Sequence, residues 1–175
     1  MPYDILISGG EVIDPSQQLR GVRDVAIADG KIVAMEERIS GDAVNKIDAR
    51  GLLVVPGLID LHVHVYPHVP LGLYPDPLCP AGGVTTMLDA GTAGSYNFAP
   101  FRKEIIDRAE TQIFSLVNLC CAGLVAANLG ELLDRRYADP EGVVQTIAKH
   151  PDVAVGVKIR AGAHIIGEGD RKSVV

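Results

Sequence analysis

Two histidines at the end of an apolar run, His62 and His64, are the residues best suited to chemistry in this sequence. Side chains alternate between the two faces of a strand, so residues i and i+2 project from the same face. The buried strand predicted over 54–66 would therefore present both imidazoles together, as a metal ion requires of two ligands on one element. Asp60 lies on the same face and could orient a ligand or stabilise the first turn. A coincidence on a solvated strand edge is the alternative, because His-x-His is a short pattern.

The residues around this histidine pair make the pattern more specific. The string P-G-L-I-D-L-H-V-H, at 56–64, combines a Pro-Gly pair, an apolar run, an acid and the two histidines. It resembles the first-strand motif of the amidohydrolase superfamily. This resemblance implies a metal-dependent hydrolase built on a TIM-like (β/α)8 barrel, and it extends nearly end to end, to about residue 169.

A second buried strand is predicted over 84–90, and it ends in an acid followed by a glycine turn. The string G-G-V-T-T-M-L-D-A-G-T resembles the second barrel strand of the same superfamily, where a strand-end acid follows G-V-T-T. By this resemblance we expect Asp89 to contact substrate. Residues 66–83 hold five prolines, which exclude a long helix and predict an irregular loop over the barrel mouth. His68 in this loop is a second candidate for substrate contact, with a solvated loop histidine as the simpler alternative.

A lysine lies inside the fourth apolar strand that the sequence predicts, V-A-V-G-V-K-I-R at 153–160. A cation in such a strand is costly unless it is paired or modified. An amine that reaches solvent, or a salt bridge at the strand end, would remove that cost. The resemblance implies a third solution, in which Lys158 is carboxylated by carbon dioxide and the carbamate bridges two divalent metal ions, expected to be Zn²⁺. The implied metal ligands of this chain are therefore His62, His64 and Lys158.

The opening part of the chain, residues 1–53, has the pattern of a small all-β unit. The predicted short strands lie at 3–9, 11–14, 24–28, 31–35 and 44–48, and a tight turn is predicted at Gly9-Gly10 between the first two. Asp29-Gly30 separates two of them and predicts a type I′ hairpin turn, in which both central residues take positive φ. Taken alone, the pattern fits a generic β domain. The resemblance implies a small β-sandwich that strands from the far C-terminus of the parent enzyme complete.

Residues 54–169 are predicted to form about the first four βα units of the barrel, an α/β fold. A third strand is expected at 113–119, and helices are expected at 97–112 and 140–150. Asp139 before the second helix is a residue type favoured at the N-cap, and the proline after it suits the first helical position.

The composition excludes several classes of partner. The 175 residues carry a net charge of −6 without a block of Lys or Arg, so neither nucleic acid nor an anionic membrane is an expected partner. No apolar run is long enough for a transmembrane helix, and the first residues lack the basic start of a signal peptide. Three cysteines, two of them adjacent, do not look like a disulfide framework, which fits a reducing cytoplasm.

The resemblance also orders the candidate functions. The strings V-G-V-K-I-R and T-M-L-D-A-G-T are most similar to the deacetylase group, whose substrates are small N-acyl or O-acyl acids. Cyclic amidases of the dihydroorotase and hydantoinase type are the first alternative. In either case two metal ions would activate a water, and an aspartate would pass its proton to the leaving group. The non-enzyme alternatives are a structural homologue without catalysis and a metal-binding module that uses only the histidine pair. Close relatives often associate, so a homo-oligomer of the parent is also expected.

The chain is shorter than the predicted fold requires. A complete barrel takes ~250 residues, and residues 56–169 supply about half of that number. The resemblance places two more histidine ligands and the proton-shuttle aspartate on later strands, and His164 follows strand four too closely to be one of those ligands. We therefore expect this chain to be a truncated N-terminal half with little or no catalysis, and with an open sheet edge that favours aggregation.

The last six residues, 170–175, do not begin the amphipathic helix expected after strand four. The codons GAT-CGG-AAG-AGC-GTC-GTG would encode D-R-K-S-V-V, and this string is shared with a common short-read sequencing adapter whose next triplet is a stop. We therefore expect a non-native tail, with native sequence ending near Gly169. A genuine basic C-terminal tail is the alternative.

Overall fold

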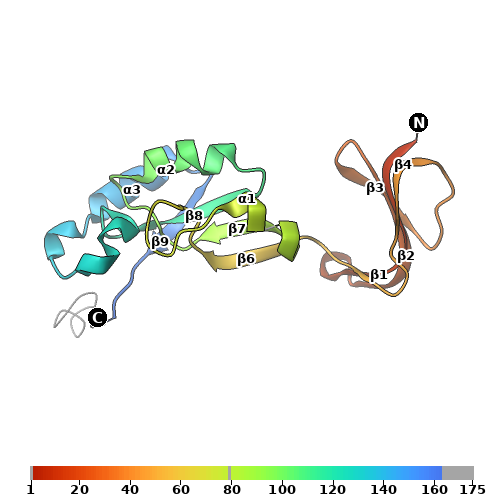
Figure 1. The fold of residues 1–175 in the computed structure, drawn as a ribbon, viewed down its shortest axis with the longest axis horizontal. Coiled ribbons are helices and arrows are strands. Elements are labelled where there is room, and N and C mark those ends of the chain that lie inside the picture. Colours follow the sequence, from red (N-terminus) through yellow and green to blue (C-terminus); the bar gives the residue numbers. More distant parts are fainter. Residues whose placement is uncertain (1, 79, 163–175) are drawn as a thin grey trace. The chain divides into compact units, whose positions relative to one another are not determined.

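A computed structural model describes residues 2–78 and 80–162 of the chain (Figure 1). The chain divides into two compact units, Met1–Pro56 and Gly57–Val175, and each is described by itself. His164 and the predicted tail at 170–175 lie outside the described residues.

The first unit is a five-stranded sheet in the order β3-β2-β1-β4, with β5 also paired to β1. The strands are β1 (Tyr3–Asp14), β2 (Leu19–Ala28), β3 (Lys31–Glu36), β4 (Ala43–Asp48) and β5 (Leu53–Val54). Neighbours along β1, β2 and β3 are antiparallel, whereas β4 and β5 run parallel to β1. A 3-10 turn, Pro15–Gln17, joins β1 to β2.

The hairpin predicted at Asp29-Gly30 is confirmed, with φ of 51° and 69° at the two turn residues. The turn predicted at Gly9-Gly10 is wrong, because β1 continues through it as one strand with a bulge. Asp24, a nearly buried carboxylate on β2, accepts a hydrogen bond from the backbone N–H of Gly9 at 2.8 Å. Gly9 has φ of 74°, a conformation that suits glycine in a bulge.

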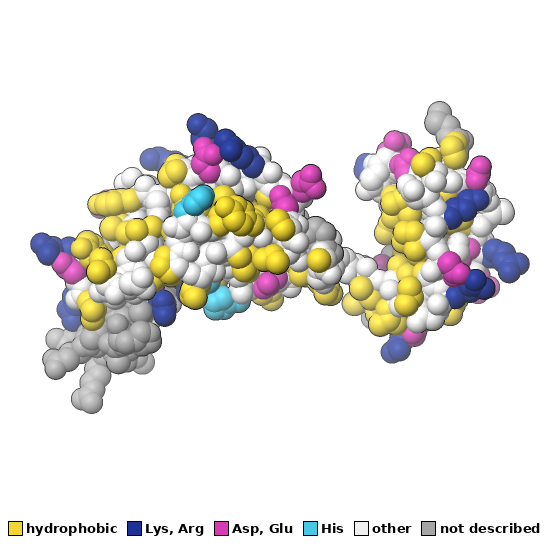
Figure 2. Space-filling view, in the orientation of Figure 1, with side chains coloured by type: hydrophobic (Ala, Val, Ile, Leu, Met, Phe, Trp, Pro, Cys, Tyr) yellow, Lys and Arg dark blue, Asp and Glu magenta, His cyan; other side chains and the backbone are white. Residues whose placement is uncertain are grey.

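This unit carries large apolar side chains in solvent, and Figure 2 shows yellow side chains over its surface. Val44 is 73% exposed and Ile32 is 60% exposed, although both lie on strands. The described strands of this unit form a single layer, so the predicted sandwich needs a second layer from sequence outside them.

The second unit is built on four parallel strands in sequential order, β6-β7-β8-β9. The strands are β6 (Leu58–Val63), β7 (Val84–Asp89), β8 (Gln112–Asn118) and β9 (Ala154–Lys158), and the helices are α1 (Pro75–Leu78), α2 (Phe98–Glu104) and α3 (Pro140–Lys149). Short 3-10 segments occur at Pro80–Gly82, Ile106–Arg108, Gly123–Leu129 and Arg135–Tyr137. A parallel sheet with strands in chain order and helical connections is the arrangement of a partial (β/α)8 barrel, so the predicted fold class is confirmed.

The core of this unit lies between the sheet and the helices α2 and α3, which Figure 1 shows together on one side of the strands. Phe98 and Phe101 of α2 are fully buried against Val117 of β8 and Val143 of α3. Each buried phenylalanine contributes roughly 1.5–3 kcal/mol of hydrophobic stabilisation, so this aromatic pair fixes α2 on the sheet.

The burial predicted for the first and fourth strands is wrong in part. On β6, Leu61 is 70% exposed, and on β9, Val157 is 47% exposed. Both are edge strands of the four-stranded sheet, and in the described chain helices cover one face of it only. A parallel sheet is normally covered on both faces. The apolar runs of β6 and β9 therefore indicate that a second layer packs on the other face, but the described chain does not contain this layer.

The helix predicted over 97–112 is also shorter than expected, because α2 ends at Glu104 and β8 begins at Gln112. Ile105 and Ile106 both pack against the core. Adjacent residues point about 100° apart on a helix, so a continuous helix would turn one of them away. The second predicted helix is confirmed: Asp139 caps α3 by accepting from the Gly142 N–H at 2.9 Å.

The predicted loop between β6 and β7 is confirmed, with the four-residue α1 as its longest regular element. None of the helices in residues 2–78 and 80–162 has the length and apolar character needed to cross a membrane.

Candidate metal centre

The carboxyl ends of the four parallel strands each carry a polar residue. His62 is next to last in β6, while Asp89, Asn118 and Lys158 are the final residues of β7, β8 and β9. Parallel strands bring these ends to one edge of the sheet, which is where α/β proteins place their sites.

A cavity of about 260 Å³ opens at this edge, and all three predicted metal ligands line it. It is lined by His62, His64, Leu71, Ala90, Asn118, Leu124, Glu131, Lys158 and Arg160. Two histidines at the end of β6 and a lysine at the end of β9 thus face one space, although nearly a hundred residues separate them in the chain.

The two imidazoles lie side by side but in different surroundings. Their ring centroids are 5.8 Å apart, and the rings stand at 84° to each other. His62 is exposed and His64 is partly buried. The observed strand β6 ends at Val63, so His64 lies just beyond it, whereas the strand predicted over 54–66 included both histidines. Asp60 accepts a hydrogen bond from the His62 backbone N–H at 3.0 Å, so it holds the backbone at the strand end.

His64 is held by a chain of two hydrogen bonds. Its Nδ1 lies 2.8 Å from the Thr92 hydroxyl, which donates to Asp89 Oδ2 at 2.6 Å. Burial lowers the pKa of His64 below its usual value; His62 and Lys158 act in the same direction, and Asp89 opposes them. The neutral imidazole is the form that binds a metal ion.

The turn after β7 is shaped around Lys158. Gly91 has φ of 79°, and a Cβ at this position would lie 2.3 Å from Lys158 Cβ and 2.6 Å from its Cγ. The Asn118 side chain donates to the Gly91 carbonyl at 2.9 Å and holds the turn in place. Glycine at 91 therefore allows the lysine stem to cross the turn and reach the cavity.

A buried acid on the cavity wall escapes prediction from the sequence. Glu131 is fully buried, accepts from Asn118 Nδ2 at 3.2 Å and pairs with the Arg160 guanidinium at 2.9 Å. Arg160 has a sequence signal, because it lies two residues after Lys158 and shares its face. Glu131 has none, since it follows no strand and its partner lies 29 residues away.

The two residues predicted to contact substrate do not line this cavity. Asp89 is fully buried, and its carboxylate accepts hydrogen bonds from the Val65 N–H and from Thr92. His68 is exposed in the loop after β6, with its ring edge-on to Tyr66. Their contact with substrate stays a prediction, whereas Thr92, which no sequence pattern singles out, touches a predicted ligand directly.

The donor set suits a divalent metal ion in part. Two neutral imidazoles are good zinc ligands, and a lysine becomes an anionic ligand once it is carboxylated. Among residues 2–78 and 80–162, no three His, Cys, Asp or Glu side chains gather as a metal-binding group. A four-coordinate zinc would therefore need ligands beyond His62 and His64, and Lys158 is a further candidate in the same cavity.

The chain is similar to known proteins in both sequence and structure. The chain is 38% identical over 141 residues to a deacetylase, Atu3266, of Agrobacterium fabrum, covering 79% of this chain and 34% of the relative. A crystal structure of an adenine deaminase matches with a TM-score of 0.79 and 36% identity, over 95% of this chain and 44% of that one. A dihydroorotase structure matches with the same TM-score and 32% identity, over 93% and 44%. No protein-family model matches the chain.

These relatives show that the chain belongs to the amidohydrolase superfamily, as the first-strand motif predicted, and that it corresponds to the N-terminal part of its members. The chain spans about a third to less than half of the length of the relatives it matches. The named activities of those relatives differ, so membership in the superfamily does not fix the substrate.

Proposed function

We propose that the parent of this chain is a metal-dependent hydrolase of deacetylase type, which cleaves the acyl bond of a small N-acyl or O-acyl acid in the cytoplasm. The observation that carries the proposal is the shared cavity of His62, His64 and Lys158 at the carboxyl ends of β6 and β9. The 38% identity to a deacetylase supports the reaction type.

Each cavity residue has a role in this proposal. His62 and His64 would hold one divalent ion, and the carbamate of Lys158 would bridge it to a second. When bound, such ions, expected to be Zn²⁺, polarise the scissile carbonyl and lower the pKa of a bound water. Arg160, held by the buried Glu131, offers a fixed cation for the acid group of the substrate. Leu71 and Leu124 supply apolar wall for the acyl group.

The proposal covers the whole parent protein, and we propose that this 175-residue chain is its inactive N-terminal part. In the described chain the cavity is lined by residues of β6, β8 and β9 and of the segments that follow the strands, and the proton-shuttle aspartate and further histidines would come from later strands. A homo-oligomer of the parent and the non-native origin of residues 170–175 belong to the same proposal.

A cyclic amidase is the second candidate, because the dihydroorotase structure matches as well in TM-score as the adenine deaminase does. The substrate would then be a ring amide. The two candidates share the metal ligands and differ in the bond that is cleaved.

The first experiment is to amplify the source DNA independently across the codon for Gly169 and to express the complete reading frame. We expect about two zinc ions per chain, and turnover of acetylated small acids that a chelator abolishes. Lys158→Met should lose at least one metal ion and nearly all turnover, whereas Lys149→Met on the exposed side of α3 should change neither. Turnover of cyclic amides alone would favour the second candidate, and a complete frame without bound metal would refute both.

A further inference from the structure

A buried carboxylate and a hydroxyl lie behind His64, on the side away from the cavity. Asp89 and Thr92 are both fully buried, and neither lines the cavity. They sit three residues apart in the turn after β7, so the turn itself brings them together. What they can do follows from which atoms donate and which accept.

The Asp89 carboxylate accepts hydrogen bonds on both oxygens. Oδ1 accepts from the Thr92 backbone N–H at 2.7 Å, and Oδ2 accepts from the Val65 N–H at 2.9 Å. The Thr92 hydroxyl donates to Oδ2 at 2.6 Å, and the Ser115 hydroxyl reaches Oδ1 at 3.4 Å. A threonine hydroxyl has one proton, and the 2.6 Å hydrogen bond directs that proton of Thr92 to Asp89, whose two oxygens act as acceptors.

Because the Thr92 hydroxyl proton is used in the bond to Asp89, the Thr92 oxygen can only accept a hydrogen bond from His64. Thr92 Oγ1 lies 2.8 Å from His64 Nδ1, and a hydrogen bond at that distance needs a proton from one partner. Since the hydroxyl proton points to Asp89, Nδ1 must carry it. A neutral imidazole has one N–H, so Nε2 then holds the free lone pair.

We infer that Asp89 and Thr92 are positioning residues, which fix His64 in the Nδ1–H tautomer and so keep Nε2 available as a ligand atom. Asp89 acts on the backbone as well, because it binds the N–H of Val65, the residue after His64. Both the ring and the peptide that carries it are therefore tied to one carboxylate. A hydrogen bond of this kind sets which nitrogen of a histidine binds metal.

The neighbouring histidine provides an internal comparison. His62 is exposed, and its ring lies edge-on to that of His64. Among the described residues no hydrogen bond of the His62 ring is found, so no such bond selects its tautomer, whereas the tautomer of His64 is fixed.

This inference rests on the proposed function only for the use of Nε2, and the tautomer itself can be measured without metal. In the ¹⁵N-histidine-labelled 175-residue chain, long-range ¹H–¹⁵N spectra at pH about 8 should show the His64 proton on Nδ1, with His64→Gln as the assignment control. Thr92→Val should abolish this preference and Thr92→Ser should retain it. A His64 proton on Nε2 in the unaltered chain would overturn the inference, whether or not any variant folds.

A titration with Zn²⁺ separates this inference from the proposed function. Thr92→Val should weaken zinc binding roughly 10–100-fold, the usual cost of losing such a partner. The zinc affinity of Thr92→Ser should be within a few-fold of that of the unaltered chain. Thr85→Val, an exposed change on β7, should have the same zinc affinity as the unaltered chain. Equal zinc affinity and an unchanged His64 tautomer in Thr92→Val would overturn the inference. An Nδ1–H tautomer without zinc binding in any variant would support the hydrogen-bond assignment and count against the metal site.

Discussion

Two turns in this chain contain the same residue types, aspartate and glycine, but have different structural roles. Asp29-Gly30 closes the β2–β3 hairpin of the first unit, with positive φ at both residues and nothing within 4 Å of a Cβ built on Gly30. Asp89 to Thr92 follows β7 in the second unit, where Gly91 also has positive φ but lies against Lys158. The hairpin turn satisfies the backbone alone, whereas the second turn also positions His64 and Lys158.

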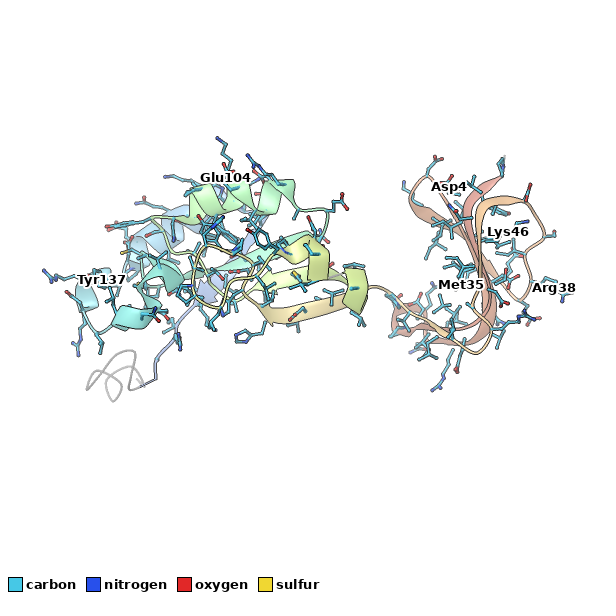
Figure 3. The ribbon with its side chains drawn as sticks, in the orientation of Figure 1. Asp4, Met35, Arg38, Lys46, Glu104 and Tyr137 are labelled. Atoms are coloured by element: carbon cyan, nitrogen blue, oxygen red, sulfur yellow. The ribbon has the colours of Figure 1, made fainter. Side chains whose placement is uncertain are left out.

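The difference lies in what surrounds each aspartate. At the hairpin, the Asp29 N–H donates to Asp4, a side chain at the surface of the unit (labelled in Figure 3), and no hydrogen bond of the Asp29 carboxylate is found among the described residues. Asp89, in contrast, is fully buried and accepts from backbone and hydroxyl donors. A buried acceptor cannot be removed without leaving its donors unpaired, so the same residue type carries a much larger energetic consequence at 89 than at 29.

The largest expected effect is the loss of the Asp89 carboxylate. Asp89→Ala leaves two buried backbone N–H groups and the Thr92 hydroxyl without an acceptor, which should cost on the order of 3 kcal/mol or more. Asp29→Ala should cost about 1 kcal/mol, mainly because alanine is less suited to positive φ. Urea unfolding followed by amide resonances of each unit gives both values. Similar losses for the two variants would refute the distinction between the turns.

The next effect separates backbone strain from crowding at the two glycines. Gly30→Ala and Gly91→Ala both place a Cβ at positive φ, which should cost about 1 kcal/mol each. Only at Gly91 does the new Cβ meet a neighbour, Lys158 Cβ at 2.3 Å, and overpacking of this kind costs a further 1–3 kcal/mol, roughly.

The Gly91→Ala variant should also move the lysine, which is observable as a shift of the Lys158 side-chain NMR signals. Gly30→Ala should leave those signals unchanged, because it lies in the other unit. Equal destabilisation by the two substitutions, with no change at Lys158, would show that Gly91 has the same backbone role as Gly30.

These turns also show which parts of the fold the sequence can predict. The Asp29-Gly30 hairpin and the Asp139 cap of α3 depend on local residues, and both predictions are confirmed. The turn predicted at Gly9-Gly10 is wrong, because the bulge there depends on Asp24, fifteen residues away. The burial predicted for Leu61 on β6 is wrong for a related reason: an apolar run indicates that a face needs covering but not whether the described chain covers it.

The candidate site divides in the same way. His62, His64 and Lys158 lie in motifs at strand ends, so the sequence alone predicts them as candidate ligands. Thr92 and Glu131 act through partners that are distant in sequence, at separations of 28 and 29 residues. Glu131 has no short-range signal. For Thr92, the three-residue spacing from Asp89 fits the hydrogen bond within the turn after β7, but it does not predict the contact with His64.

The smallest expected effect concerns a polar cluster on the helical layer, which contrasts with the buried cluster behind His64. Arg102 of α2 pairs with Asp152 at 2.7 Å and donates to His150 Nδ1 at 3.1 Å. Burial lowers the pKa of His150, and the Arg102 charge lowers it further, while Asp152 opposes both. The folded chain therefore binds a proton at His150 less readily than the unfolded chain does.

The direction of the pH effect follows from that difference. Between the lowered folded pKa and the unfolded value of 6.5, the unfolded chain holds more protons, so stability rises with pH. The contribution of His150 is complete above about pH 6.5 and is lost as the pH falls through the folded pKa. Metal-free His64 has a lowered pKa as well and adds a slope of the same sign. Urea midpoints from pH 5 to 8 should thus fall toward acid, and His150→Gln should remove part of that slope.

A control assigns the slope to individual histidines. Saturation with Zn²⁺ should make the His64 part of the slope steeper, because a metal-bound imidazole resists protonation. If the pH dependence of stability is unchanged in His150→Gln, then Arg102 does not lower the pKa of His150 in the folded chain. The helical cluster would then be an ordinary surface ion pair, worth less than about 1 kcal/mol, and the contrast with the buried carboxylate behind His64 would be greater still.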